Sequence, residues 1–254
     1  MPPAADFCFL DWPAPIAFAH RGGASEVPEN TMPAFEHAVR LGYRYVETDV
    51  HVTADGVLLA FHDDVLDRVT DRRGVIGELP WSEVAAARVD GTEPIPLFED
   101  LLGAFPDLRV NVDPKHDAAV EPLAEVLHRC GAVDRVCVGA FSDERLERVR
   151  ALVPGVCTSL GPAGTLQLGL AAAGQDDVGE LVSPCAQVPP LYGDTPIVTE
   201  EFVAEAHRRG MQVHVWTIDD EAEMRRLLDL GVDGVMTDRP AALRAVLEER
   251  GEWV

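Results

Sequence analysis

The chain has 254 residues, of which 47% are hydrophobic and 6% aromatic, so it is long enough to bury a large aliphatic core. Its formal net charge of -23 excludes the basic surface that nucleic acids require and disfavours stable docking on an anionic membrane. Residues 1–15 contain no basic segment and no long apolar run, so we expect neither a signal peptide nor a transmembrane segment.

Short apolar runs alternate with longer amphipathic segments along the chain. We expect strands at 16–19, 44–50, 108–113, 135–140, 155–160, 184–188, 212–217 and 233–237. We expect helices at 32–41, 97–104, 117–130, 143–152, 164–172, 199–209, 220–230 and 240–249. A strand followed by a helix, repeated eight times, predicts an α/β fold of the (β/α)8 TIM-barrel type. The runner-up is a doubly wound sheet, which usually carries a GxGxxG fingerprint that this chain lacks.

One segment departs from the repeat. Residues 51–96 hold an extra extended piece at 57–62 and then a turn-rich stretch, which we interpret as a short insertion after the second strand. With no low-complexity linker, the chain is expected to form a single barrel domain over about 16–250 within residues 1–254. Asn30 or Thr31 is the predicted cap of the first helix, and Gly42 its end.

Five scattered cysteines form no CxxC pair, which indicates reduced thiols and a cytoplasmic protein. Three of them, Cys130, Cys137 and Cys157, lie among apolar residues and are expected to fill the core.

Carboxylates gather where two predicted strands end. Glu47 and Asp49 share one face of the second strand because side chains alternate, and Asp113 ends the third strand. Reactive groups of a (β/α)8 barrel lie at these C-terminal strand ends. Such an acidic cluster is costly to bury unless a cation neutralises it. All-oxygen ligands favour one divalent cation, Mg²⁺ or Ca²⁺.

Two cations lie beside the predicted carboxylate cluster. Arg21 follows the first strand, and Lys115, the only lysine of the chain, shares the face of Asp113. Three carboxylates, a dication and these two side chains together carry a charge of +1. A site of that charge suits a singly charged anion such as a phosphodiester.

Two histidines end apolar runs, His20 in AFAH and His62 in LLAFH. Histidine is the side chain best matched to proton transfer near neutral pH, so these two are the predicted acid and base. The remaining histidines receive a structural interpretation, except that the role of His51 stays open because it shares the acidic face but lies further along the strand.

An ordered set of motifs then points to one family. The chain resembles the glycerophosphodiester phosphodiesterases of the phospholipase C-like phosphodiesterase superfamily. The motifs are AHRGG (19–23), PENT (28–31), VETDVHVTADG (46–56), FHDD (61–64), GELPWSEV (77–84), IPLFEDLL (95–102), VNVDPK (110–115), VHVWTID (213–219) and GVDGVMTDRP (231–240). They span nearly the whole chain in the family's order.

This resemblance implies a (β/α)8 barrel that hydrolyses glycerophosphodiesters to an alcohol and sn-glycerol 3-phosphate through a cyclic phosphate. It implies that His20 and His62 are catalytic, that Arg21 and Lys115 contact phosphate, and that Trp216 forms an apolar wall. The metal ligands that it implies are Glu47, Asp49 and Asp113.

The chain departs from the family pattern at two positions. It has Asp113 where glutamate is usual, which leaves the choice between Mg²⁺ and Ca²⁺ open, and Asp219 where asparagine is usual.

Several alternatives remain at this point. The closest is a lysophospholipase D or phospholipase C-like enzyme acting on lipids with the same machinery. A non-hydrolytic metal-binding barrel would need more ligands from later strands, and a degenerate binding protein would not need both histidines. We expect a small-molecule substrate, no nucleic acid partner and no stable membrane insertion, with the oligomeric state open.

Overall fold

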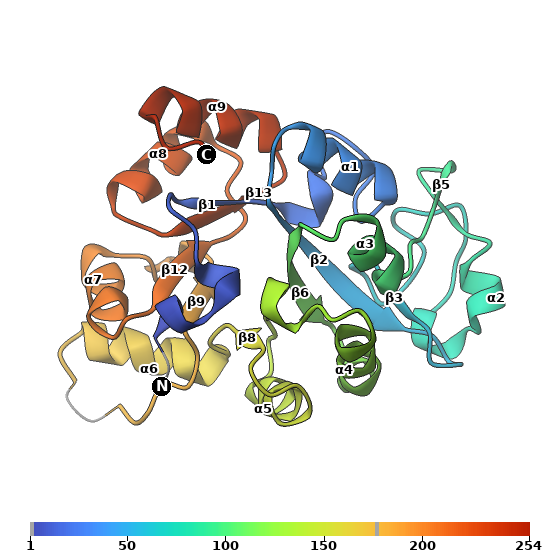
Figure 1. Cartoon of the computed structure of the whole chain (residues 1–254), viewed down its shortest axis with the longest axis horizontal. Helices are drawn as coiled ribbons and strands as arrows, with labels where there is room; N and C mark the ends of the chain where they lie inside the picture. Colours follow the sequence, from blue (N-terminus) through green and yellow to red (C-terminus); the bar gives the residue numbers. More distant parts are fainter. Residues whose placement is uncertain (1–2, 176–177) are drawn as a thin grey trace.

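The computed structural model describes residues 3–175 and 178–254, and eight parallel strands form a nearly closed barrel at its centre (Figure 1). These are β1 (Ile16–Ala19), β2 (Tyr45–Val52), β6 (Arg109–Pro114), β7 (Val136–Val138), β8 (Cys157–Thr158), β9 (Cys185–Val188), β12 (Gln212–Val215) and β13 (Gly234–Thr237). Their order is β8–β7–β6–β2–β1–β13–β12–β9, and a parallel bridge between Ser159 and Cys185 joins β8 to β9. The predicted barrel is therefore confirmed.

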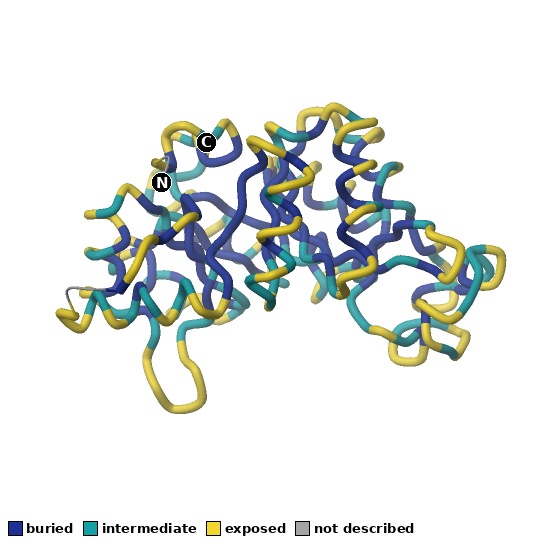
Figure 2. Tube along the Cα trace, turned by 90° about the horizontal axis from the view of Figure 1, so that it is seen from below, coloured by how far each residue is buried: buried dark blue, intermediate teal, exposed yellow. Residues whose placement is uncertain are grey.

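Helices follow the barrel strands and surround them, with buried residues inside and exposed residues outside (Figures 1 and 2). They are α1 (Met32–Arg40), α3 (Phe98–Ala104), α4 (Val120–Arg129), α5 (Asp143–Leu152), α6 (Pro162–Ala172), α7 (Glu200–Arg208), α8 (Glu221–Asp229) and α9 (Pro240–Arg250). Short 3-10 turns η5 (Asp117–Ala119) and η6 (Val133–Arg135) and a hairpin of β10 (Leu191–Tyr192) and β11 (Thr195–Pro196) complete these connections. No helix within the described residues is long and apolar enough to span a membrane.

The first helix begins at one of its two predicted caps. The Thr31 hydroxyl accepts a hydrogen bond from the backbone N–H of Ala34 at 3.3 Å, so Thr31 is the N-cap of α1. Asn30 instead has a φ of 54° and donates its side-chain amide to Asp49, which ties the start of the helix to β2. Gly42, with a φ of 88°, ends this helix as predicted.

The N-terminal end of the barrel is closed by the first segment of the chain, which contains η1 (Ala4–Asp6) and η2 (Cys8–Leu10). Phe9 and Leu10 are buried and pack with Phe18 and Tyr45 inside the barrel. The hydroxyl of Tyr45 donates to the carbonyl of Phe9 at 2.8 Å. Packed aromatic side chains fill this end of the barrel. Functional groups of a (β/α)8 barrel lie at the other end, at the C-terminal ends of the strands.

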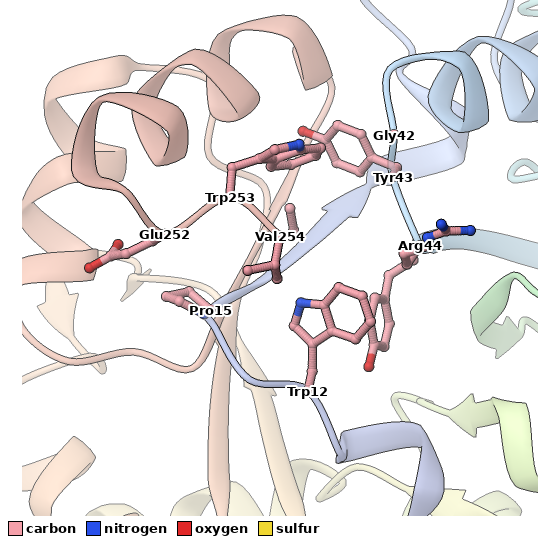
Figure 3. A pocket seen from close by; sticks show the side chains of 10 residues that line it. Trp12, Pro15, Gly42, Tyr43, Arg44, Glu252, Trp253 and Val254 are labelled. Carbon is pink, nitrogen blue, oxygen red and sulfur yellow. The ribbon is translucent and has the colours of Figure 1, made fainter.

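A small hollow on the closed end is lined by aromatic side chains that join both chain ends to the barrel (Figure 3). The rings of Tyr43 and Trp253 meet at 5.1 Å, and the hydroxyl of Tyr43 donates to the carbonyl of Pro240 at 2.7 Å. Trp12 lies edge-on to Tyr45 at 5.6 Å. This hollow lies at the starts of β1 and β2, so it serves packing rather than the site at their other ends.

The predicted insertion begins with β3 (Leu58–Ala60), which runs antiparallel to β2 with Ala60 opposite Val50. It continues through η4 (Ile76–Glu78), α2 (Trp81–Val84), β4 (Arg88–Val89) and β5 (Glu93–Pro94) around its own cluster of buried apolar side chains. The backbone N–H of Phe61 donates to the carbonyl of Asp49 at 3.0 Å. The returning strand therefore delivers the next residue, His62, to the end of β2.

Candidate active site

The chain turns sharply as it leaves β1. His20 begins the short turn η3 (His20–Gly22), in which Arg21 has a φ of 50° and Gly22 a φ of 81°. A Cβ atom on Gly22 would lie 2.7 Å from the Cβ of Ala34, so only glycine allows α1 to pack this closely. The turn presents the imidazole of His20 and the guanidinium of Arg21 at the mouth of the barrel.

The three predicted acidic residues lie together on two adjacent strands. Glu47 and Asp49 alternate along β2, and the strand register places Asp113 of β6 directly beside Asp49. Glu47 and Asp49 are buried, and the side chain of Asp113 is only 13% exposed. This register is the physical reason that residues 64 positions apart form one cluster.

Lys115 joins two of these carboxylates. Its ammonium lies 2.6 Å from Oδ1 of Asp49 and 2.8 Å from Oδ2 of Asp113. Burial opposes the charge of Lys115, but the two carboxylates outweigh it and raise the pKa of the ammonium. Burial likewise opposes ionisation of Asp49, yet Lys115 outweighs it and lowers the pKa of that carboxyl. The only lysine of the chain is therefore a charged member of this cluster.

Glu47 contacts no lysine or arginine side chain among the described residues. Burial, together with the negative charge of Asp49, raises the pKa of Glu47 to about 7. Its Oε2 accepts a hydrogen bond from the backbone N–H of Arg21 at 3.2 Å and lies 3.7 Å from Nε2 of His20. The neighbouring cations therefore only partly offset the effects of burial and of Asp49 on Glu47.

The donor set suits a hard divalent cation. Oδ1 of Asp113 is buried and has no hydrogen-bond partner among the described residues, which leaves a strong acceptor free. Within residues 3–175 and 178–254, Glu47, Asp49 and Asp113 do not bring one oxygen each within 4.8 Å of the others. These three side chains must therefore move slightly closer together to coordinate one ion. The short side chain of Asp113 contributes to this separation.

Each of the two predicted catalytic histidines is held by a carboxylate on the same ring nitrogen. Nδ1 of His20 donates to Oδ1 of Asp238 at 2.6 Å, and Nδ1 of His62 donates to Oδ1 of Asp63 at 2.6 Å. Both contacts fix the ring orientation and the tautomer, which leaves Nε2 free for proton transfer. Burial lowers the pKa of His20, but Glu47 and Asp238 outweigh it, and the pKa lies above its ordinary value.

A chain of ion pairs connects the two histidine loops. Arg21 donates to Glu29 at 3.0 Å, and Arg68 donates both to Glu29 at 2.7 Å and to Asp63 at 2.6 Å. Asp63 in turn holds His62. The two arginines outweigh burial and lower the pKa of Glu29, so this carboxylate stays ionised between them. The loop after β1 and the loop after β3 are thereby fixed relative to each other.

Trp216 lies apart from the charged cluster, at the end of β12. Its ring meets that of Phe141, which follows β7, edge-on at 5.7 Å. Trp216 also packs against the apolar cluster inside the barrel. The two aromatic rings form an apolar part of the mouth.

Asp238 is a site residue that the sequence did not predict, and its position depends on Asp219. Oδ1 of Asp219 accepts hydrogen bonds from the hydroxyl of Thr237 at 2.9 Å and from the backbone N–H of Asp238 at 2.8 Å. Asp219 thus orders the turn that carries the partner of His20. The predicted barrel offered one indirect signal for Asp238. In a closed barrel the last strand pairs with the first, and here β13 pairs with β1 and places Thr237 beside Ala19. The residues that follow these two strands, Asp238 and His20, are therefore neighbours.

His51, whose role the sequence left open, is buried beneath the His62 loop. Its Nε2 donates to the carbonyl of His62 at 3.0 Å. Burial lowers the pKa of His51 and favours its neutral form. The contact ties β2 to the loop that follows β3.

Eight parallel strands with charged side chains at their C-terminal ends define an enzyme-type (β/α)8 barrel. The sequence pattern of the Glycerophosphoryl diester phosphodiesterase family matches residues 20–242. "Probable glycerophosphodiester phosphodiesterase 2" of Mycobacterium tuberculosis (strain ATCC 25618 / H37Rv) is 42% identical over 96% of this chain and 95% of its own. The chain therefore belongs to the glycerophosphoryl diester phosphodiesterase family. It is an enzyme, a phosphoric diester hydrolase.

Two further comparisons extend this result. A human relative, "Lysophospholipase D GDPD1", is 29% identical over 90% of this chain and 85% of its own. The structure of an Oleispira antarctica phosphodiesterase in complex with the product sn-glycerol-3-phosphate superposes with a TM-score of 0.79 at 23% identity, over 92% of this chain and 97% of that one. The second likeness confirms the fold.

Proposed function

We propose that the enzyme hydrolyses glycerophosphodiesters to an alcohol and sn-glycerol 3-phosphate, with His20 and His62 as general acid and base. The observation that carries this proposal is the pair of imidazoles, each held at Nδ1 by an aspartate at 2.6 Å beside the buried carboxylate cluster. Two oriented imidazoles supply the two proton transfers that cleavage of a phosphodiester requires.

In the first step, the 2-hydroxyl of the glycerol moiety attacks phosphorus while one imidazole takes its proton. The other imidazole protonates the leaving alcohol, and a cyclic phosphate forms. Water then opens this ring with the two histidines in exchanged roles. Arg21 and Lys115 lie beside the acidic cluster and offset the charge of the phosphoryl oxygens as the reaction proceeds.

Glu47, Asp49 and Asp113 would hold one divalent cation, Mg²⁺ or Ca²⁺, because their oxygens are hard ligands and Oδ1 of Asp113 has no hydrogen-bond partner in the described part of the chain. A bound dication would neutralise charge on the phosphoryl group. Trp216 and Phe141 would form the apolar side of the mouth against the carbon skeleton of the substrate.

A lipid substrate is the second candidate. Phe141 is 70% exposed, and Leu191 and Tyr192 of β10 are 51% and 79% exposed, all on segments that follow barrel strands at the mouth. The human relative is named as a lysophospholipase D. An apolar rim of this kind would accept the acyl chain of a lysophospholipid.

A substrate and metal screen tests both candidates. Chelator-treated enzyme is incubated with glycerophosphocholine, glycerophosphoethanolamine, glycerophosphoglycerol or lysophosphatidylcholine, in EDTA, Mg²⁺ or Ca²⁺. We expect glycerol 3-phosphate from the water-soluble diesters only when a dication is present. Full activity in EDTA would contradict the metal assignment, whereas release of choline from lysophosphatidylcholine alone would favour the lipid candidate.

A further inference from the structure

A second group of side chains that can bind a metal ion lies beside the candidate active site, outside the carboxylate cluster. His51 of β2, Asp64 after β3 and His116 after β6 each place one ligand atom within 4.8 Å of the other two. Nε2 of His116 donates to Oδ1 of Asp64 at 2.9 Å, and the rings of His51 and His116 lie 5.3 Å apart. Three separate segments of the chain thus converge at one point on the rim.

The environment of His51 matches that of a metal-binding histidine. Its Nε2–H donates to the carbonyl of His62. In the neutral ring, Nδ1 is then the unprotonated nitrogen, and its lone pair is free. Histidines that bind metals in proteins usually donate their other ring N–H to a carbonyl or carboxylate in this way. His51 is 2% exposed, which fixes the ring, whereas Asp64 and His116 are exposed and leave a path for an ion from solvent.

We propose that His51, Asp64 and His116 form a second metal site that binds a transition-metal dication such as Zn²⁺. Two imidazoles and one carboxylate are typical zinc ligands and poor ligands for Mg²⁺ or Ca²⁺. When an ion binds, the hydrogen bond between His116 and Asp64 is replaced by metal–ligand bonds of about 2.0–2.2 Å. A water molecule fills the fourth position of a tetrahedral coordination shell.

Occupancy of this site affects the reaction centre through the backbone. His51 holds the carbonyl of His62, Asp64 lies two residues after it, and His116 directly follows Lys115. An ion bound by these ligands therefore links the loop of a catalytic histidine to the strand end that carries the phosphate-binding lysine. The site is separate in chemistry from the carboxylate cluster but shares its scaffold.

Calorimetric titration of chelator-treated protein with Zn²⁺, in buffer with excess Ca²⁺ to occupy the carboxylate cluster, tests this site. The variants are His116→Ala and Asp64→Asn. The matched control is His128→Ala, an exposed histidine of α4 whose Nε2 donates to the carbonyl of Leu152. We expect saturable one-to-one binding in the wild type and the control, weakened by more than about 100-fold in His116→Ala.

Two outcomes would overturn the proposal. One is an absence of saturable binding in the wild type, and the other is equal affinity in all four proteins. Co²⁺ as a spectroscopic substitute adds an independent readout: intense visible bands that disappear in His116→Ala support the site. A near-ultraviolet thiolate band that persists in that variant would assign the ion to the buried trio Cys137, Cys157 and Cys185 instead.

Discussion

Asp238, which follows β13, holds His20, which follows β1, through a 2.6 Å contact between Oδ1 and Nδ1. The two residues are 218 positions apart in the sequence and become neighbours because the last barrel strand pairs with the first. The orientation of this imidazole thus depends on closure of the barrel.

Replacing Asp238 by Asn tests this positioning role. The amide removes the negative charge and permits the wrong tautomer of His20, so we expect kcat to fall by about 100-fold or more. Because Asp238 helps to raise the pKa of His20, the apparent pKa of His20 in the pH–rate profile should also fall. Asp219→Asn is the matched control, since an asparagine oxygen still accepts both hydrogen bonds. An unchanged profile in Asp238→Asn would contradict the role.

Removal of either imidazole should abolish turnover without unfolding the protein. His20→Ala and His62→Ala are each expected to lower kcat by about 10²- to 10⁴-fold, the usual contribution of general acid–base catalysis. Thermal unfolding and calcium binding should stay close to wild type. His37→Ala, which removes the contact between His37 of α1 and the carboxylate of Glu26, serves as the control. Normal hydrolysis by either variant would refute the assignment.

The contribution of Glu47 to the stability of the metal-free enzyme should decrease between about pH 4.5 and pH 7. Glu47 has a pKa of about 7 in the folded state and about 4.5 in the unfolded state, so the folded state binds the proton more tightly. The stabilisation is therefore complete below pH 4.5 and lost as the pH rises through 7, by about 3 kcal/mol in total. Urea unfolding in EDTA measures it. The stability of the wild type relative to Glu47→Gln should fall over this range, and a rise in that difference would contradict the prediction.

The ion pairs that join Arg21 to His62 should matter for activity more than for folding. Arg68→Ala removes the link between Glu29 and Asp63, and the His62 loop loses its fixed position. We expect kcat/KM to fall by about tenfold, since small displacements of catalytic groups are costly. Arg40→Ala, which breaks an exposed pair with Glu36 on α1, should leave it unchanged. Equal activity in both variants would argue against a positioning role.

Only the thiol of Cys8 should react rapidly with a thiol reagent in the native protein. Cys8 is exposed, Cys130 is partly buried, and the remaining three are buried in the barrel. We expect one fast equivalent, lost in Cys8→Ser, and further reaction only after denaturation. Rapid modification of several thiols in the native state would show that the barrel interior opens readily.

Sequence periodicity predicted the elements well because apolar residues recur at strand and helix spacing in nearly every segment. The observed bounds differ from the predicted ones by three residues or fewer, and the largest difference is at the start of α4, where the 3-10 turn η5 precedes the helix. Alternation likewise placed Glu47 and Asp49 on one face, because strand geometry requires it.

The residues that the sequence did not reveal all depend on contacts between distant segments. Glu29 lies in the PENT motif and Asp63 in the FHDD motif, but neither motif predicts what these carboxylates contact. Their roles follow from Arg68, which comes from the insertion and reaches both. A local pattern carries no information about such a bridge, because its three members belong to loops whose relative position is set by tertiary packing.

The antiparallel course of β3 has a consequence for how the enzyme can diversify. His20 follows β1, the first strand of the barrel, whereas His62 follows β3, which runs antiparallel beside β2. Length changes beyond Arg68, whose ion pairs fix the His62 loop, would therefore leave both imidazoles in place.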